Sequence, residues 1–308
     1  MWWYVAKRLL QTIPVFLGAT LLLFAMLKLQ PGDPILALVG DKPVSEATRA
    51  ALTEQYHLDD PVVVQWFHFV LNAIQLDFGE TFSGQPVFDI IRETFPVTVV
   101  LAVMALTIDA VLGIAIGTIA GLRKNGVFDS VTLVLSLILL SIPIFVVGFI
   151  AQLIFGVKLG WTSPTVGADW TVGSLVLPAF VLAIANLAYT MRLTRTSVAE
   201  NTGADHVRTA RAKGLSERLV VRNHILRNSL VPVVTYIGIN LGSLMAGAII
   251  TETIFNIPGI GNAAYSAIVR GETSTVVAIV TFMVLVYVLM SLLVDLFYAV
   301  LDPRIRYA

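Results

Sequence analysis

Long apolar runs alternate with short polar segments along most of the chain. A bilayer core of roughly 30 Å requires about 20 apolar residues per helix. The pattern therefore predicts six membrane-spanning helices, at residues 9–29, 96–122, 130–157, 174–191, 230–254 and 274–300. Pro143 and Pro178 fall inside the third and fourth runs and are expected to interrupt them. The first run follows Lys7 and Arg8 but is too long for a secretory signal and lacks a small-residue cleavage site, so we interpret it as a retained anchor.

The composition supports an all-α integral membrane protein. Hydrophobic residues make up 57% of the chain and charged residues 13%, with a mean hydropathy of +0.85. In a typical soluble domain about 25% of the residues are charged. The chain has no cysteine, which excludes disulfides, thiolate metal sites and a cysteine nucleophile.

The net charge of zero conceals a segregation of the basic residues between the two sides of the six-span arrangement. Lys and Arg accumulate in cytoplasmic loops. Most of them lie on the side that holds both termini and the loop 192–229, which we therefore expect in the cytoplasm. The opposite side holds only Lys28, Lys42, Arg49, Arg92, Lys158 and Arg270.

The segment 31–94 is acidic and is expected outside the cell. Its apolar stretch Val62–Leu76 suggests short amphipathic helices on the membrane surface, with a folded external cap as the alternative. Within the spans, small residues recur at every fourth position and indicate close helix contacts. These small residues are Gly113, Gly117 and Gly121 in one span, and Gly238, Gly242 and Ala246 in another.

Acidic residues inside apolar spans are costly, by about 2.5–3.5 kcal/mol on insertion scales, and should face protein or water. Asp109 and Asp295 fall inside predicted spans, and Glu252 near an external end. They suggest either a polar path or a hydrogen-bonded clamp between helices, and the clamp is favoured for Asp109 and Asp295. On the fifth span, Asn240, Ser243, Gly247 and Thr251 follow helical spacing and, with Glu252, are candidates for a translocation path.

The loop sequence DHVRTARAKG, Asp205–Gly214, predicts a short basic helix between two apolar spans. Asp205 can cap its start and Gly214 can supply the left-handed residue that ends it, while Ser216 can cap a second helix over 217–227. A loop that only fixes topology would need charge alone. The small residues Thr209, Ala210 and Ala212 favour a surface that inserts into a partner's groove.

The stretches RTARAKG and RNHILRNSLVPVVT, from Arg208 to Thr235, resemble the EAA loop of binding-protein-dependent ABC importer permeases of the dipeptide and oligopeptide type. Further similarities are PGDP at 31–34, DFGETFSGQPV at 77–87, Pro96 and Thr98, ETIFNIPGIG at 252–261, and LDPRIR at 301–306. The general EAA pattern has Glu and Ala where Arg208 and Thr209 stand, a variant familiar in the peptide branch. After Arg270 the branch has an Asp and, two residues on, a Pro, whereas this chain has Gly271, Glu272 and Thr273.

The resemblance implies a type I importer permease fold in the bacterial inner membrane, with an N-terminal helix at 1–30, an external loop at 31–94 and a permease core at 95–308. The implied partners are a second homologous permease, two cytoplasmic ATPase domains, an external substrate-binding protein and membrane lipid, with no nucleic acid. The helix near 205–214 would transmit the ATPase motion. The implied contact consists of Asp205, Arg208, Thr209, Ala210, Arg211, Ala212, Lys213 and Gly214.

The sequence lacks common catalytic motifs, so we do not expect an enzyme. The chain has no GxxxxGKS/T phosphate loop, so ATP and Mg²⁺ are expected on partner subunits, and no cofactor, metal or catalytic site is expected here. HExxH and GxSxG are absent as well. Peptides are the expected cargo, with nickel, haem or another small solute as the alternative. An ion-coupled transporter that uses Asp109, Glu252 and Asp295 is the rival from another class.

Overall fold

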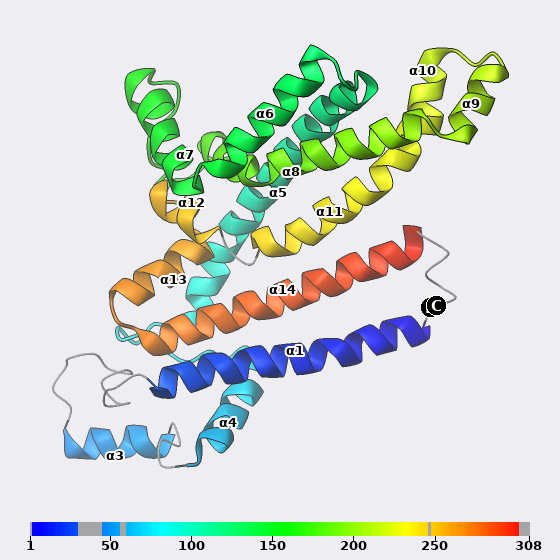
Figure 1. Ribbon diagram of the computed structural model, residues 1–308. Helices are drawn as coiled ribbons and strands as arrows, with labels where there is room; N and C mark the ends of the chain where they lie inside the picture. Colours follow the sequence, from blue (N-terminus) through cyan, green and yellow to red (C-terminus); the bar gives the residue numbers. More distant parts are fainter. Residues whose placement is uncertain (1, 30–44, 56–59, 246–247, 302–308) are drawn as a thin grey trace. The chain divides into compact units, whose positions relative to one another are not determined.

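The computed structural model describes residues 2–29, 45–55, 60–245 and 248–301, and these fold almost entirely into helices (Figure 1). Contacts divide the chain into two compact units. The first contains Met1–Val99, Met245–Thr253 and Pro258–Ala308, and the second contains Val100–Leu244 and Ile254–Ile257. The motifs PGDP at 31–34 and most of LDPRIR at 301–306 lie outside the described residues.

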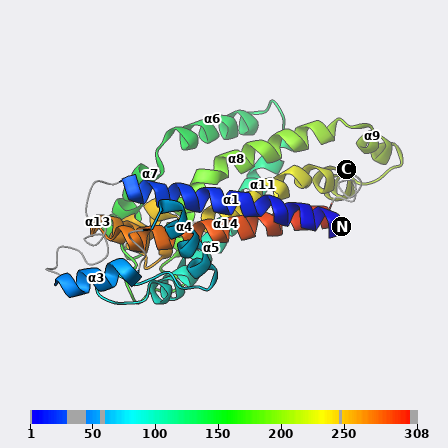
Figure 2. The same cartoon turned by 90° about the horizontal axis from the view of Figure 1, so that it is seen from below.

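The first unit joins the two ends of the chain. α1 (Trp2–Leu29) and α14 (Thr273–Leu301) run side by side in both views (Figures 1 and 2). The unit also holds α3 (Glu46–Gln55), α4 (Val62–Ile74), the start of α5 (Val87–Leu122), most of α12 (Ile249–Ile254) and α13 (Ile260–Val269). Its core is formed by the buried residues Ala73, Phe78, Val87, Ile91, Ile260, Ala264, Ala278, Ile279 and Met283.

α4 confirms the helix expected in the external segment and packs against α1. The indole nitrogen of Trp66 donates a hydrogen bond to Thr20 Oγ1 at 3.2 Å, and the rings of Phe24 and Phe69 lie 6.0 Å apart. Val63 and Phe67 stay exposed on the other side of α4. One apolar face is thus covered by the chain itself, and the second is available to lipid or another protein.

The second unit holds the remainder of α5 and the middle of the chain. Its elements are α6 (Val127–Ser141), α7 (Ile144–Ala151) with a π-helical extension (Gln152–Lys158), α8 (Val176–Thr202), α9 (Asp205–Ala212), α10 (Glu217–Val220), a π-helical segment (Val221–Leu226) and α11 (Arg227–Met245).

The glycines at every fourth position of α5 confirm the expected close helix contact, and the partner is α8. A Cβ atom at Gly117 would lie 2.6 Å from the carbonyl oxygen of Met191 and 2.6 Å from Thr194 Cβ. A Cβ at Gly121 would lie 2.7 Å from the carbonyl oxygen of Arg195. Real Cβ contacts are not this short, so the two backbones approach to a distance that only glycine permits.

Four helices of the described part are long and apolar enough to cross a membrane: Val87–Leu122, Val176–Thr202, Glu217–Met245 and Thr273–Val294. The pair Val127–Ser141 and Ile144–Lys158 would make a fifth, but it is bent by 98° and is not the single straight span expected at 130–157. The expected span at 9–29 falls within α1, which has 28 residues and includes the apolar stretch Leu10–Met26. Six spans and cytoplasmic termini therefore stay predictions.

Of the two expected proline interruptions, the one at Pro143 is confirmed and the one at Pro178 is wrong, and the fifth span also needs correction. Pro143 does break its span, because it takes the capping position before α7. Pro178 does not, because α8 begins at Val176 and its first turn has no amide hydrogen bond to lose. The expected fifth span, 230–254, is instead divided into α11, which ends at Met245, and α12, which begins at Ile249.

Candidate functional site

The basic loop after α8 folds into α9, a tight turn and α10. Gly214 has φ +78°, in the left-handed region, as expected for the residue after a helix. Asp205 does not cap α9: Ala204 holds the capping position, and Asp205 is the first helical residue, with its carboxylate 3.3 Å from Arg208 Nη1. Ser216 holds the capping position of α10, but its side chain makes no capping hydrogen bond.

The predicted contact residues divide into a surface set and one interior residue. Asp205, Arg208, Thr209, Arg211, Ala212, Lys213 and Gly214 are exposed. Ala210 is only 3% exposed and packs with Val207, Val198, Val220 and Ile225. Its predicted place on an outward-facing small-residue surface is therefore wrong, because the loop has a hydrophobic core of its own, and Ala210 belongs to it.

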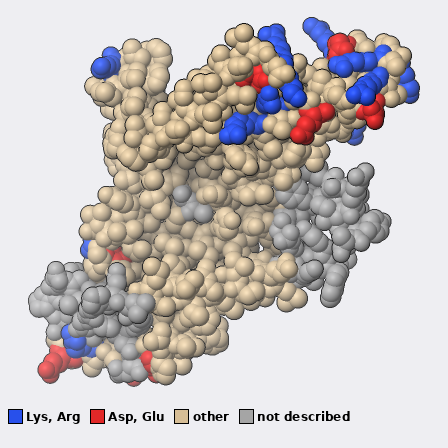
Figure 3. Space-filling view, viewed as in Figure 1, with Lys and Arg blue, Asp and Glu red and all other residues tan. Residues whose placement is uncertain are grey.

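Charged groups gather on the outside of this loop. Lys and Arg side chains concentrate over α9 and α10, with a few acidic groups among them (Figure 3). The guanidinium of Arg211 forms two hydrogen bonds with the carboxylate of Glu217, at 2.8 and 3.3 Å. This hydrogen-bonded partner raises the pKa of Arg211 above its ordinary value. Arg211 therefore stays charged at physiological pH.

Polar contacts connect the loop to α11, and α11 in turn to α8, in addition to the loop's hydrophobic core. The hydroxyl of Ser229 donates to the carbonyl oxygen of Ser197 at 3.1 Å. His206 Nε2 lies 3.1 Å from the carbonyl oxygen of His224 and 3.1 Å from Asn228 Nδ2. α9 is therefore fixed to the end of α8 by these polar contacts together with the hydrophobic core.

The candidate path residues differ in environment. Ser243 is exposed and Asn240 half-buried, both in the second unit, whereas Thr251 and Glu252 are buried in the first. Gly247 lies outside the described residues. A path role for these residues stays a prediction.

Glu252 joins three segments of the first unit. Its carboxylate accepts hydrogen bonds from Thr98 Oγ1 at 2.7 Å and from the backbone N–H of Asn262 at 2.9 Å. The same hydroxyl of Thr98 accepts the N–H of Ile260 at 2.9 Å. A Cβ atom on Gly259 would collide with the carboxyl group. Glu252 thus supplies from α12 the acceptor that the start of α13 requires.

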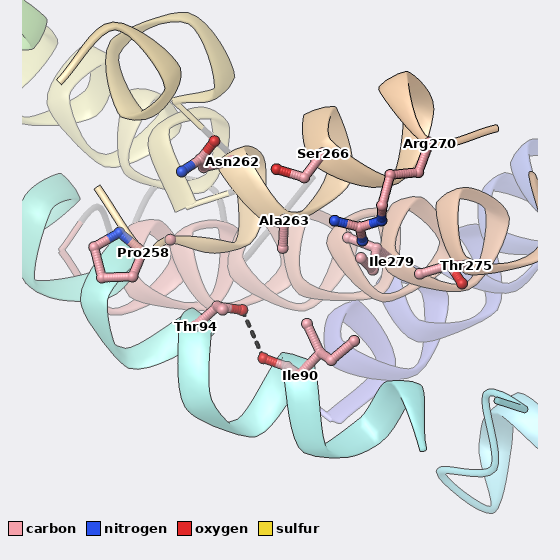
Figure 4. A pocket seen from close by; sticks show the side chains of 10 residues that line it. Ile90, Thr94, Pro258, Asn262, Ala263, Ser266, Arg270, Thr275 and Ile279 are labelled. Atoms are coloured by element: carbon pink, nitrogen blue, oxygen red, sulfur yellow. Dashed lines mark hydrogen bonds between the residues drawn. The ribbon is translucent and has the colours of Figure 1, made fainter. Parts of the chain in front are cut away.

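A cavity of about 240 Å³ lies beside this junction (Figure 4). The lining includes Ile90 and Thr94 of α5, Ser266 of α13, Arg270 just after α13, and Thr275 of α14. Arg270 Nε donates to Glu272 at 2.6 Å, and the hydroxyl of Thr275 donates to the other oxygen of Glu272 at 3.0 Å. Glu272, one of the residues that depart from the peptide-branch pattern, is therefore hydrogen-bonded to two residues of the lining.

Asp109 lies in the second unit, where its environment fits the clamp interpretation. Its side chain is 1% exposed, and Oδ2 accepts a hydrogen bond from Thr190 Oγ1 of α8 at 3.0 Å. Oδ1 has no hydrogen-bond partner among the described residues. The side chain of Asp295 lies outside the part of the structure that is described.

One charged pair was not foreseen from the sequence. Asp129 of α6 accepts two hydrogen bonds from Arg195 of α8, at 2.8 Å from Nε and 2.6 Å from Nη2. The two side chains are 2% and 17% exposed. The two residues are far apart in sequence, and only the packing of α6 on α8 brings them together as a partly buried pair.

The comparisons with known proteins agree with this architecture. The family described as binding-protein-dependent transport system inner membrane component matches residues 113–307, from the glycine ridge of α5 to the C-terminal end. The chain belongs to this family. It is thus a multi-pass membrane component of an ABC transport system, a class that works with ATPases and a binding protein.

Two relatives of this transport component carry more specific names. The di/tripeptide transport system permease protein DppB of Pseudomonas aeruginosa (strain UCBPP-PA14) is 36% identical, and the alignment covers 99% of this chain and 98% of the relative. The dipeptide transport system permease protein DppB of Escherichia coli (strain K12) is 35% identical, with 99% and 98% covered. Both similarities extend through the first unit, which lies largely outside the family match.

Proposed function

We propose that the chain is the membrane-spanning permease subunit of an ATP-driven, binding-protein-dependent importer of dipeptides or oligopeptides. The observation that carries the proposal is the near-complete coverage of two peptide permeases at 35–36% identity. A similarity limited to the shared transport core would support only the general class. This one includes α1 and α4, which lie outside the family match.

The proposed role of α9 is to receive the motion of a partner ATPase. ATP and Mg²⁺ are bound by two ATPase domains on the cytoplasmic side, a second permease completes the path, and an external protein delivers the peptide. α9 suits a groove on the ATPase because it is short, exposed and basic, and because its own core holds it in shape. Arg208, Thr209, Ala212 and Lys213 form the contact, and Ala210 supports it from inside.

The proposed cycle follows from this attachment. Closure of the ATPase pair displaces α9, and the displacement reaches α8 because Val207 and Ala210 are packed against Val198. The two permeases then rock between outward-open and inward-open states, which is a rigid-body transition. No side chain of this permease takes part in a chemical step.

The test is a bulky substitution on the exposed side of α9. We expect Ala212→Trp or Thr209→Trp, in the complete complex in proteoliposomes, to lower peptide uptake per ATP hydrolysed by about tenfold, because a ring larger than the native side chain would keep α9 from seating in its groove and overpacking of this kind costs about 1–3 kcal/mol. The matched control is Thr165→Trp, an exposed threonine in another loop. Unchanged uptake per ATP in both α9 variants would contradict the proposed contact.

Peptide cargo is tested separately with the wild-type complex. ATP hydrolysis is measured with the binding protein alone and with the binding protein loaded with a dipeptide. The proposal requires stimulation by the loaded form and uptake of the labelled peptide. Stimulation only by nickel or haem would assign the same architecture to another cargo.

A further inference from the structure

The ion pair between Asp129 and Arg195 is partly buried and has a fixed geometry: Asp129 is 2% exposed and Arg195 17%. Two parallel hydrogen bonds join the carboxylate and the guanidinium. A third, from the backbone N–H of Asn125 at 2.9 Å, also ends on Asp129 Oδ2. Paired donors and acceptors of this type fix both the distance and the orientation of the groups they join. The pair therefore sets how α6 lies against α8.

The pair stands next to the attachment of α9. Arg195 precedes Val198 by less than one helical turn, and Val198 is the α8 residue in the core that holds α9. On the α5 side, a Cβ at Gly121 would meet both Val198 Cβ and the carbonyl oxygen of Arg195 at 2.7 Å. One turn of α8 thus contacts α5, α6 and α9.

The opposite end of the α6–α7 segment also has firm contacts. After the bend at Pro143, Gln152 donates to the carbonyl oxygens of Ile254 at 2.7 Å and Pro164 at 2.8 Å. A Cβ at Gly148 would lie 3.2 Å from Ile254 Cδ1. Covalent and packed contacts therefore connect α9 to the segment Ile254–Ile257 through α8, α6 and α7, all within the second unit.

Stability alone gives little reason for such a pair. Two charges removed from water lose hydration that their attraction roughly repays, so an apolar pair of similar size often stabilises a protein as well or better. The established use of buried ionic groups is to fix one register between elements, because a shifted register leaves a charge unpaired. A contact through which one helix moves another, such as that between α8 and α6, requires a fixed register.

We propose that Asp129 and Arg195 are positioning residues that pass the displacement of α9 from α8 to the α6–α7 segment. This rests on the proposed function, in which α9 is the contact with the ATPase. Neither side chain touches the cargo. Together they keep α6 and α8 in register, so that movement of α8 moves α6 and, beyond the Pro143 bend, the Gln152 contacts to Ile254.

The experiment measures uptake per ATP hydrolysed in proteoliposomes that contain the complete complex. Arg195→Lys keeps the charge but removes the paired donors, and Asp129→Asn keeps the shape but removes the charge. We expect each to lower uptake per ATP by about tenfold while the amount of assembled complex and the hydrolysis rate stay within about twofold, since groups in direct contact couple at this level. A purely structural role would instead lower assembly, with uptake and hydrolysis falling together and their ratio unchanged.

Two controls use exposed charges of the same helix. Arg192→Lys matches Arg195→Lys, and Glu200→Gln removes a carboxylate from the exposed side of α8. Both should leave uptake per ATP within about twofold of wild type, because exposed charges contribute little.

A double variant, Asp129→Asn with Arg195→Gln, completes the test. It leaves no unpaired charge and permits an amide–amide hydrogen bond, so we expect its loss to be smaller than the product of the losses of Asp129→Asn and Arg195→Gln measured alone. Two results would overturn the proposed positioning role of the ion pair: losses of uptake per ATP that multiply in the double variant, or unchanged uptake per ATP in Arg195→Lys. If Thr209→Trp uncouples transport and Arg195→Lys does not, the positioning role of the ion pair is wrong, and the proposed function of the chain still stands. If the wild-type complex imports no peptide, the proposed function fails.

Discussion

Buried polar residues in this chain serve mainly to connect elements. Glu252 supplies an acceptor to the start of α13, and Asp109 accepts the hydroxyl of Thr190 across the α5–α8 contact. Sequence alone marks both as unusual, because acids in apolar runs are costly. It cannot distinguish a clamp from a path, since that depends on which donor the fold brings to the carboxylate.

Asp109 gives a prediction at this scale. Asp109→Asn keeps an oxygen for the Thr190 hydroxyl and removes the carboxylate, so we expect peptide uptake within about twofold of wild type if the residue acts as a clamp between helices. Thr190→Val removes the donor instead and should lower the apparent unfolding temperature, with a loss of about 1 kcal/mol. Abolished uptake in Asp109→Asn at normal protein level would favour the ion-coupled alternative.

At the scale of helices, periodic small residues and prolines were informative to different degrees. The glycine repeat of α5 correctly indicated a close contact, but the identity of α8 as the partner required the fold. Pro143 and Pro178 look alike in sequence. Their effects differ because one precedes the first turn of a new helix and the other lies within a first turn, which depends on where each helix begins.

The close contact of α5 with α8 at Gly117 leads to a testable prediction. Gly117→Leu would force α5 and α8 apart, and overpacking of this kind costs about 1–3 kcal/mol. We expect a lower apparent unfolding temperature of the purified protein and less assembled complex. Gly18→Leu is the control, because nothing lies within 4 Å of a Cβ at Gly18 on α1. Equal effects of both substitutions would show that the contact is not tight.

For α9, the sequence predicted the helix and the turn correctly but not the burial of Ala210. Charge, Gly214 and the motif correctly placed a helix, a turn and a second helix. The spacing of Val207 and Ala210, three residues apart among charged neighbours, is typical of an inward face and could have indicated that Ala210 is buried. The Asp129–Arg195 pair offered no such signal, because its partners are far apart in sequence and meet only through the packing of α6 on α8.

At the scale of the whole molecule, membership of the family predicts that the chain is part of a complex with other proteins. We expect purification of the tagged chain in mild detergent to recover a second permease and P-loop ATPases, identified by mass spectrometry. The recovered ATPase activity should rise with a peptide-loaded binding protein. A pure homo-oligomer without ATPases would contradict the importer assignment and favour ion-coupled transport.

The hydrophobic core beneath α9 has a consequence for how such a complex is put together. A segment that becomes ordered only on binding loses conformational entropy at that moment, which weakens association. Here Val198, Val207, Ala210, Val220 and Ile225 have already fixed the loop within the single chain. If α9 is the ATPase contact, as proposed, the ATPase would meet a loop that is already folded, and assembly would be the docking of two rigid bodies rather than folding on contact.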